Sequence, residues 1–302
     1  MHIAVIGYGE VGRIFAEDLR AAGHQVTAFD TKLRTAAGVP MRAHSLVHGV
    51  TLAESPASAT RWAELTVSAV TASQTVAAAE DCAAGLPAGS FFLDVNSASP
   101  GAKIAASAPV ARRGARYVEA AVMTPVPPYR IKAPLLLGGP HAADALPALR
   151  ELGFAAQVSS AELGIASATK MCRSVVIKGL EAMVIESFVA ARRYGVEAAM
   201  LASLRETFPG IDWEQQAGYF FQRVIKHGRR RAEEMREAAV TVREAGLDPF
   251  SASSAADRQT WVADLADAGL FSDHRRGEAA DTHDWRIDAD RIIDHVRSTK
   301  HE

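Results

Sequence analysis

Three glycines near the start of the chain form a pattern that can hold a phosphate group. Gly7-Tyr8-Gly9-Glu10-Val11-Gly12 follows a short apolar run at residues 3–6, and a helical pattern comes after it. In this setting Gly7 permits a tight turn, Gly9 lets the backbone approach a pyrophosphate, and Gly12 lets the helix pack on the strand. Backbone amides at the start of the helix would hold the phosphate charge. Strand, glycine triplet and helix in this order predict a dinucleotide-binding loop formed by residues 7–12.

An acidic residue closes the next apolar segment. Asp30 follows residues 25–29, and its carboxylate can accept hydrogen bonds from both hydroxyls of an adenosine ribose. Its charge would repel the additional phosphate of NADP, so we expect NAD as the cofactor. Thr31, Lys32 and Arg34 follow directly, and they leave NADP as the alternative.

The candidate proton-transfer group is a lysine in a long, mostly apolar helical pattern. Lys170 has Arg173, Ser174, Lys178 and Glu181 at intervals of three or four residues, so all five share one helix face. A mostly apolar helix is a buried one, and a buried charge without a partner costs several kcal/mol. The polar face must therefore line a cavity or belong to a paired network. We expect Lys170 to be the catalytic acid and base.

Two interpretations of the other polar residues on this helix stay open. Arg173, Ser174 and Lys178 can contact a substrate, and we assign them to substrate binding. Alternatively, Lys178 and Glu181 form an internal ion network with Arg173 that only stabilises the protein.

Loops that follow the predicted strands carry further polar side chains. Asn96, Ser97 and Ser99 follow an apolar run at residues 91–94, and Thr124 follows the run at 116–122. We assign these four residues to substrate binding. We also expect Thr71, Ala72 and Asn96 to contact the cofactor, since loops at the carboxyl ends of parallel strands face the ligand. The alternative for Asn96 and Ser99 is that they cap a helix that begins near Pro100.

Apolar runs and helical patterns alternate through the first half of the chain. This alternation predicts an α/β fold, a doubly wound parallel sheet with helices on both faces. From residue 161 to about 194 one long helical segment follows, and the remainder is almost wholly helical, with breaks near residues 209, 246–249 and 269. We expect domain 1 to span residues 1–159 and an all-helical domain 2 to span residues 160–302. The apolar runs lie at residues 3–6, 25–29, 65–70, 91–94, 116–122, 134–137 and 154–158, and helical patterns separate several of them, as at 11–22 and 73–84.

Composition excludes several classes of function. The 302 residues carry a net charge of −2, which offers no basic field to attract nucleic acid or an anionic membrane. Cys82 and Cys172 are the only cysteines, which fits a reducing compartment and neither a disulfide scaffold nor a cysteine metal site. No apolar stretch is long enough to span a bilayer, so we expect a cytoplasmic protein. The polar segment 273–284 contains His274, Asp281, His283 and Asp284; we interpret it as a solvated loop and expect no metal.

Together these residues resemble the β-hydroxyacid dehydrogenase family, which contains 3-hydroxyisobutyrate and 6-phosphogluconate dehydrogenases. The similarity extends over the glycine loop, the segment from Asp94 to Pro100, and the segment from Gly164 to Ser174. It implies a Rossmann domain, a long interdomain helix, a helical domain that dimerises, and a catalytic lysine at position 170. The segment 230–235, with Gly246-Leu247-Asp248-Pro249, resembles a subgroup whose C-terminal part is labelled DUF1932.

The chain departs from the family pattern at three places. Met123-Thr124-Pro125 replaces the family's Ser-Gly-Gly loop, which removes an amide donor for a substrate carboxylate. Ser174 stands where the family has asparagine, and residues 233–235 replace a Lys-Asp-Leu motif. We therefore expect an NAD(P)-dependent oxidoreductase acting on a small, anionic β-hydroxy acid or related alcohol. The alternatives are imine reduction, which the retained Lys170 disfavours, and a non-catalytic dinucleotide-binding sensor.

Overall fold

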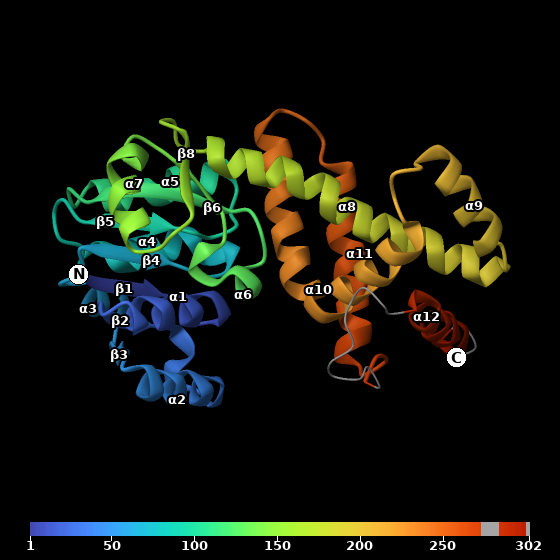
Figure 1. The fold of residues 1–302 in the computed structure, drawn as a ribbon, viewed down its shortest axis with the longest axis horizontal. Coiled ribbons are helices and arrows are strands. Elements are labelled where there is room, and N and C mark those ends of the chain that lie inside the picture. Colours follow the sequence, from blue (N-terminus) through green and yellow to red (C-terminus); the bar gives the residue numbers. More distant parts are fainter. Residues whose placement is uncertain (273–283, 300–302) are drawn as a thin grey trace. The chain divides into compact units, whose positions relative to one another are not determined.

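The structure is a computed structural model that describes residues 1–272 and 284–299. The chain divides into two compact units, residues 1–172 and residues 173–302 (Figure 1). Of the C-terminal polar residues considered above as metal ligands, His274, Asp281 and His283 lie outside the described residues. Among the described residues, no helix combines the length and apolar composition that crossing a membrane requires.

The first unit is built on an eight-stranded sheet with strand order β3-β2-β1-β4-β5-β6-β7-β8. Sequence periodicity located seven of these strands to within about two residues, and it missed only β3, which is two residues long. The strands are β1 (His2–Ile6), β2 (Gln25–Phe29), β3 (Thr51–Leu52), β4 (Leu65–Ser68), β5 (Phe91–Asp94), β6 (Arg116–Val122), β7 (Leu135–Gly138) and β8 (Ala156–Ser160).

One part of the predicted topology was wrong. The sheet is parallel from β3 through β6, but β7 pairs with β6 in the antiparallel direction, with Glu119 opposite Gly138 and Val122 opposite Leu135. The connection between them contains only α6 (Val126–Tyr129) and the 3₁₀ turn η4 (Arg130–Lys132). A crossover helix must run back along the strand, but the 4 residues of α6 rise only about 6 Å, so the chain returns in the opposite direction.

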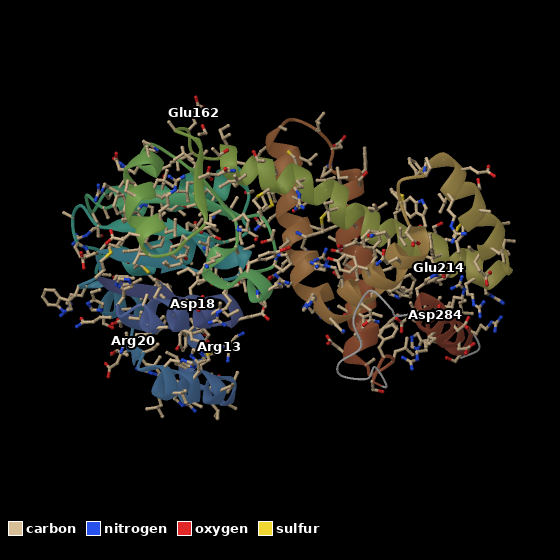
Figure 2. The ribbon with its side chains drawn as sticks, in the orientation of Figure 1. Arg13, Asp18, Arg20, Glu162, Glu214 and Asp284 are labelled. Carbon is tan, nitrogen blue, oxygen red and sulfur yellow. The ribbon has the colours of Figure 1, made fainter. Side chains whose placement is uncertain are left out.

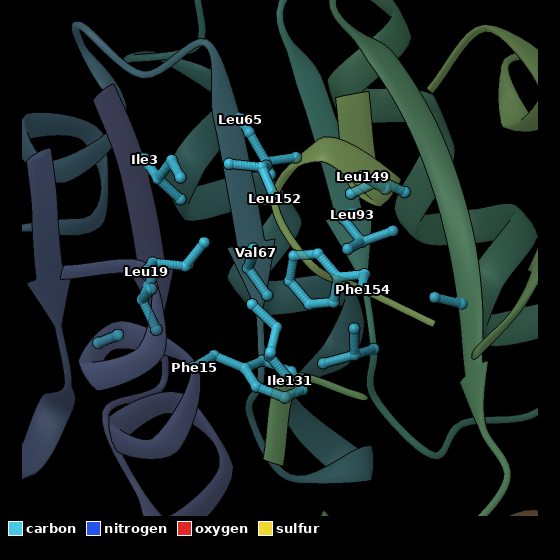
Figure 3. Packing of buried hydrophobic residues seen from close by; sticks show 14 of the residues in the cluster. Ile3, Phe15, Leu19, Leu65, Val67, Leu93, Ile131, Leu149, Leu152 and Phe154 are labelled. Atoms are coloured by element: carbon cyan, nitrogen blue, oxygen red, sulfur yellow. The ribbon is translucent and has the colours of Figure 1, made fainter. Parts of the chain in front are cut away.

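Helices cover both faces of the sheet, as the alternation predicts. The helices of this unit are α1 (Glu10–Ala21), α2 (Val39–His48), α3 (Pro56–Thr60), α4 (Thr75–Ala83), α5 (Pro100–Ala111), α6, and α7 (Ala142–Glu151), with further 3₁₀ turns η1 (Thr31–Arg34), η2 (Ala36–Gly38) and η3 (Ala72–Gln74). On one face, Phe15 and Leu19 of α1 and Leu149 of α7 pack with strand residues such as Ile3 and Val67 (Figure 3). On the other, α3, α4 and α5 pack against Phe92 and Tyr117.

The second unit is entirely helical in the residues that the structure describes. Its core gathers large aromatic side chains, among them Phe188, Phe221 and Trp285, which lie in ring contact. The helix α10 bends at His227, where the backbone leaves helical geometry. The unit contains the second part of α8 (Ile165–Tyr194), then α9 (Glu197–Thr207), α10 (Trp213–Glu244), α11 (Phe250–Asp267) and α12 (Trp285–Thr299).

The long helix α8 begins in the first unit and ends in the second. The predicted domain boundary at residue 160 precedes this helix, whereas the first compact unit extends along it to Cys172. The first unit therefore includes Lys170, which lies two residues before its end. The assignment of residues 1–159 and 160–302 to two domains stays a prediction.

Candidate active site

The glycine loop has the conformation that a dinucleotide-binding turn needs. Gly7 has φ +89°, and a Cβ there would lie 2.4 Å from the carbonyl oxygen of Ala69. A Cβ at Gly12 would lie 2.0 Å from the carbonyl oxygen of Gly7, so α1 packs directly on the turn. At Gly9 a Cβ would meet no described atom within 4 Å, which leaves space beside the first turn of α1. The loop therefore fits a pyrophosphate approached by backbone amides.

Asp30 stabilises this loop as well as closing β2. Its Oδ2 accepts a hydrogen bond from the backbone N–H of Tyr8 at 2.9 Å, and its Oδ1 accepts one from the N–H of Lys32 at 2.9 Å. The sequence predicted a ribose ligand at this position. The hydrogen bonds give the carboxylate a second role, because they fix its orientation and tie the glycine loop to the end of β2.

The loops after β4 and β5 are joined by a buried asparagine. The Oδ1 of Asn96 accepts a hydrogen bond from the N–H of Val70 at 2.7 Å, and its Nδ2 donates to Ser68 Oγ at 3.0 Å. Thr71, which follows Val70, is exposed, and Ala72 is buried in the turn η3. Asn96 thus positions the neighbouring loop, while its predicted contacts with cofactor and substrate stay predictions.

The alternative that these residues cap the helix beginning near Pro100 is confirmed for Ser99 but not for Asn96. Helix α5 begins at Pro100, and the Oγ of Ser99 accepts a hydrogen bond from the N–H of Ala102 at 3.3 Å. An N-cap hydroxyl of this kind contributes about 1 kcal/mol to stability. Ser99 is only 2% exposed, so its main observed role is to fix the start of α5.

Lys170 reaches the loop that follows β5. Its Nζ donates to Ser97 Oγ at 2.5 Å, and both residues are half-buried. Thr124, at the end of the neighbouring strand β6, has a buried Oγ1 with no hydrogen-bond partner among the described residues. The parallel strands place the loops after β1, β4, β5 and β6 at one edge of the sheet. This edge therefore carries the glycine loop, the Lys170–Ser97 pair and an unsatisfied hydroxyl.

A buried glutamate that the sequence analysis did not assign holds the start of α8. The Oε1 of Glu119 accepts hydrogen bonds from the N–H groups of Gly164 at 2.9 Å and Ala166 at 3.0 Å. Its Oε2 accepts a hydrogen bond from Ser167 Oγ at 2.8 Å. A carboxylate at a helix N-terminus satisfies open amides and interacts favourably with the helix dipole. Glu119 therefore positions the turn of α8 that precedes Lys170.

A second unassigned group lies beneath the same loops. Asp94 accepts from Lys103 Nζ at 2.8 Å and from Tyr117 OH at 2.6 Å, and all three side chains are buried. The N–H of Asn96 also donates to Asp94 at 2.9 Å, so the network anchors the loop that carries Ser97. Burial beside this carboxylate raises the pKa of Tyr117 well above its usual value, which keeps the hydroxyl protonated. The sequence did contain a signal for this network, because Asp94 is a charged residue at the end of the otherwise apolar strand β5.

The polar face of α8 beyond Cys172 forms an ion network in the second unit. Lys178 Nζ lies 2.5 Å from Glu234 Oε2, and the Nε of Arg231 donates to Glu181 at 2.7 Å. Burial is the main cause of a lowered pKa at Lys178, and Glu234 opposes this shift. The predicted network is therefore present with different partners, because α10 supplies Arg231 and Glu234.

The remaining two polar residues of this face differ in their surroundings. Ser174 is buried and its Oγ accepts from Lys178 Nζ at 3.3 Å, whereas Arg173 is exposed. The structure thus brings Ser174 and Lys178 together, and it does not bring Arg173 into the same network. Their predicted contacts with substrate stay predictions.

Sequence comparison places the chain in a family. Residues 2–145 match the NAD-binding domain of 6-phosphogluconate dehydrogenase, and residues 191–262 match DUF1932, a domain of unknown function. The solved structure of a conserved hypothetical protein from Sinorhizobium meliloti 1021 is 32% identical, with 97% of this chain and 96% of that chain covered and a TM-score of 0.75. The chain belongs to the β-hydroxyacid dehydrogenase family. Within this family it falls in the DUF1932 subgroup, as its motifs predicted.

More distant solved structures share the fold alone. A 3-hydroxyisobutyrate dehydrogenase from Mycobacterium tuberculosis is 19% identical, with 96% of this chain and 98% of that chain covered and a TM-score of 0.64. An imine reductase from Streptomyces aurantiacus is 21% identical, with 97% of this chain and 99% of that chain covered and a TM-score of 0.53. No curated protein matches the chain in sequence. These comparisons thus show a fold like that of NAD(P)-dependent hydroxyacid dehydrogenases and imine reductases.

Proposed function

We propose that this protein transfers hydride between a nicotinamide cofactor and a small β-hydroxy acid or related alcohol, with Lys170 as the general acid and base. The observation that carries the proposal is the 2.5 Å hydrogen bond from Lys170 Nζ to Ser97 Oγ, at the sheet edge that also carries the glycine loop. An oxidoreductase of this kind needs one proton-transfer group beside the cofactor site. The match to the NAD-binding domain of 6-phosphogluconate dehydrogenase supports the same reaction class.

Three residues have separate roles in the proposed reaction. The cofactor, when bound, accepts or donates the hydride. In the oxidation direction, neutral Lys170 takes the proton of the substrate hydroxyl at Nζ while the carbon loses hydride. Ser97 orients Lys170, and the unpartnered Oγ1 of Thr124 offers a hydrogen bond to the substrate in the loop where the family's amide donors are replaced.

The proposal is tested by following NADH absorbance with the full chain and a panel of small β-hydroxy acids, their keto acids, and imines. Turnover of at least one hydroxy acid, with no turnover of imines, is the expected result. Binding of NADH without turnover of any hydroxy or keto acid would contradict the proposal and favour a dinucleotide sensor. Turnover of imines alone would assign the chain to imine reduction.

Asp30 leads us to propose NAD as the preferred cofactor. We expect Asp30→Asn to reduce the preference for NADH over NADPH about tenfold or more, because the change removes one negative charge beside the position of the second phosphate. Asparagine keeps an acceptor oxygen for the N–H of Tyr8 or Lys32, so the loop should persist. The ratio of kcat/KM for the two cofactors measures the effect. A wild-type protein that prefers NADPH would overturn this assignment.

We further propose that the protein is a homodimer through its helical part. In the second unit, α8 exposes Val176 by 67% and Met183 by 65%, seven residues apart and on one face. Met183→Glu places an unpaired charge in such an interface, which costs about 3 kcal/mol and weakens the dimer roughly 100-fold. Light scattering after size-exclusion chromatography should show a monomer for Met183→Glu. Leu46→Glu, at an exposed apolar position on α2, is the control and should stay dimeric.

A further inference from the structure

Two helices of the first unit bring two histidines and a glutamate together. Glu17 lies on α1, and His44 and His48 lie four residues apart on α2, so both imidazoles occupy one face of that helix. One potential ligand atom from each of the three residues lies within 4.8 Å of the others. All three side chains are half-buried. The proposed hydride transfer uses none of them.

The spacing of these ligand atoms is close to that of a metal centre. His44 Nε2 lies 3.8 Å from Glu17 Oε2, and the rings of His44 and His48 have centroids 4.3 Å apart. Tetrahedral bonds of about 2.1 Å to nitrogen and oxygen place ligand atoms roughly 3.4 Å apart. Side-chain movements of about 1 Å or less would therefore bring the three ligand atoms around one ion, without a change in α1 or α2.

Neighbouring residues fix two of the three ligands in a suitable orientation. Arg130 Nη2 lies 3.2 Å from Glu17 Oε1, which leaves Oε2 directed at His44. The same guanidinium is held by Asp18, labelled on α1 in Figure 2, at 2.6 Å. On its other side, His44 Nδ1 lies 2.8 Å from the hydroxyl of Tyr8. Metal-bound histidines usually donate their second ring N–H to such an oxygen, which fixes the ring and its tautomer.

We propose that Glu17, His44 and His48 bind one divalent transition-metal ion of the zinc class. Two imidazoles and one carboxylate suit Zn²⁺, Co²⁺ and Ni²⁺, whereas Mg²⁺ and Ca²⁺ require sites made of oxygen atoms. Water completes the coordination, because the site is partly open to solvent. The bound ion links α1 to α2, and through His44 it contacts Tyr8, which lies inside the glycine loop.

The sequence predicted no metal, because the two cysteines lack ligand spacing and the C-terminal polar segment is typical of a solvated loop. The histidine pair of α2 was a readable signal, since two histidines four residues apart on a helix can bind one ion. The third ligand could not be found in this way, because Glu17 comes from a distant part of the chain, and only the packing of α1 beside α2 brings it close.

The proposal is tested by metal binding alone, independently of any enzymatic activity. The full chain, treated with a chelator and dialysed at pH 7.5, is titrated with CoCl₂ by absorption spectroscopy and with ZnCl₂ by calorimetry. We expect one ion per chain and a Co²⁺ spectrum with nitrogen and oxygen ligands. His48→Ala and Glu17→Gln should each weaken binding at least about tenfold. His48 is half-buried, so its variant should fold, and far-ultraviolet circular dichroism verifies this.

A matched control separates this site from adventitious binding by surface histidines. His141 also lies beside a carboxylate, with its Nδ1 3.9 Å from Asp144 Oδ2, and His141→Ala should leave both titrations unchanged. The absence of stoichiometric binding to the wild-type chain would overturn the proposal, leaving His44 and Glu17 as an ordinary polar contact. Equal binding by the wild type and folded His48→Ala would also overturn it.

Discussion

Replacing Lys170 with alanine is expected to lower kcat about 10³-fold while the affinity for NADH changes less than twofold. A positioned general acid and base contributes 10²- to 10⁴-fold to a rate, and Lys170 is the proposed group at the sheet edge. The glycine loop and Asp30, which hold the dinucleotide in the proposal, are positioned by close backbone contacts and by the hydrogen bonds that Asp30 accepts from the N–H groups of Tyr8 and Lys32. Stopped-flow absorbance gives the rate, and quenching of protein fluorescence gives NADH affinity.

Three further measurements distinguish proton transfer from a structural role of Lys170. Lys170→Arg keeps the positive charge, but its guanidinium cannot lose a proton at neutral pH. The activity of this variant should therefore be as low as that of Lys170→Ala. Added methylamine should partly restore turnover in Lys170→Ala, because it supplies a free amine. Ser97→Ala removes only the orienting hydroxyl and should lower kcat about tenfold, which corresponds to about 1.4 kcal/mol, the net worth of one hydrogen bond. Full activity in Lys170→Ala would exclude Lys170 as the catalyst.

Most of the Rossmann-like unit could be predicted from local patterns, because each strand and helix carries its own periodicity. The apolar run at residues 25–29, which ends at Asp30, coincides with β2. Glycine is required at positions 7 and 12 because a Cβ there would collide with backbone atoms. The direction of β7 could not be obtained in this way. Strand direction depends on the connection, and the short segment containing α6 and η4 had no pattern of its own.

The sequence identified the candidate residues Lys170 and Ser97, but not the residues that position them. Lys170 and Ser97 carry visible polar chemistry in apolar surroundings, and the structure brings them together. Glu119, in contrast, lies inside β6 and faces amides far along the chain, which no local pattern indicates. The same limit applies to Lys178, since its partner Glu234 comes from α10. Long-range polar partners are determined by packing, which a single sequence does not display.

Lys103 provides the largest expected effect on stability. We expect Lys103→Met to lower the free energy of unfolding by about 3 kcal/mol, because removing one member of a buried ion pair leaves the other charge uncompensated. Lys103 and Asp94 are each 1% exposed or less, and Lys103 Nζ also donates to the backbone oxygen of Asp94 at 3.0 Å. The melting temperature of the first unit should fall by roughly 6–12 °C. Differential scanning calorimetry of the full chain measures this shift.

Two comparisons make this prediction specific to the buried pair. Lys132→Met removes an exposed lysine from the same unit and should change stability by less than about 0.5 kcal/mol. In the double variant Asp94→Asn with Lys103→Met, the unpaired charge is gone, while the amide can still accept from Tyr117 or the N–H of Asn96. The double variant should therefore be more stable than Lys103→Met alone. If Lys103→Met is as stable as Lys132→Met, the ion pair does not anchor the loop that carries Ser97, and the positioning of Lys170 must depend on Glu119 instead.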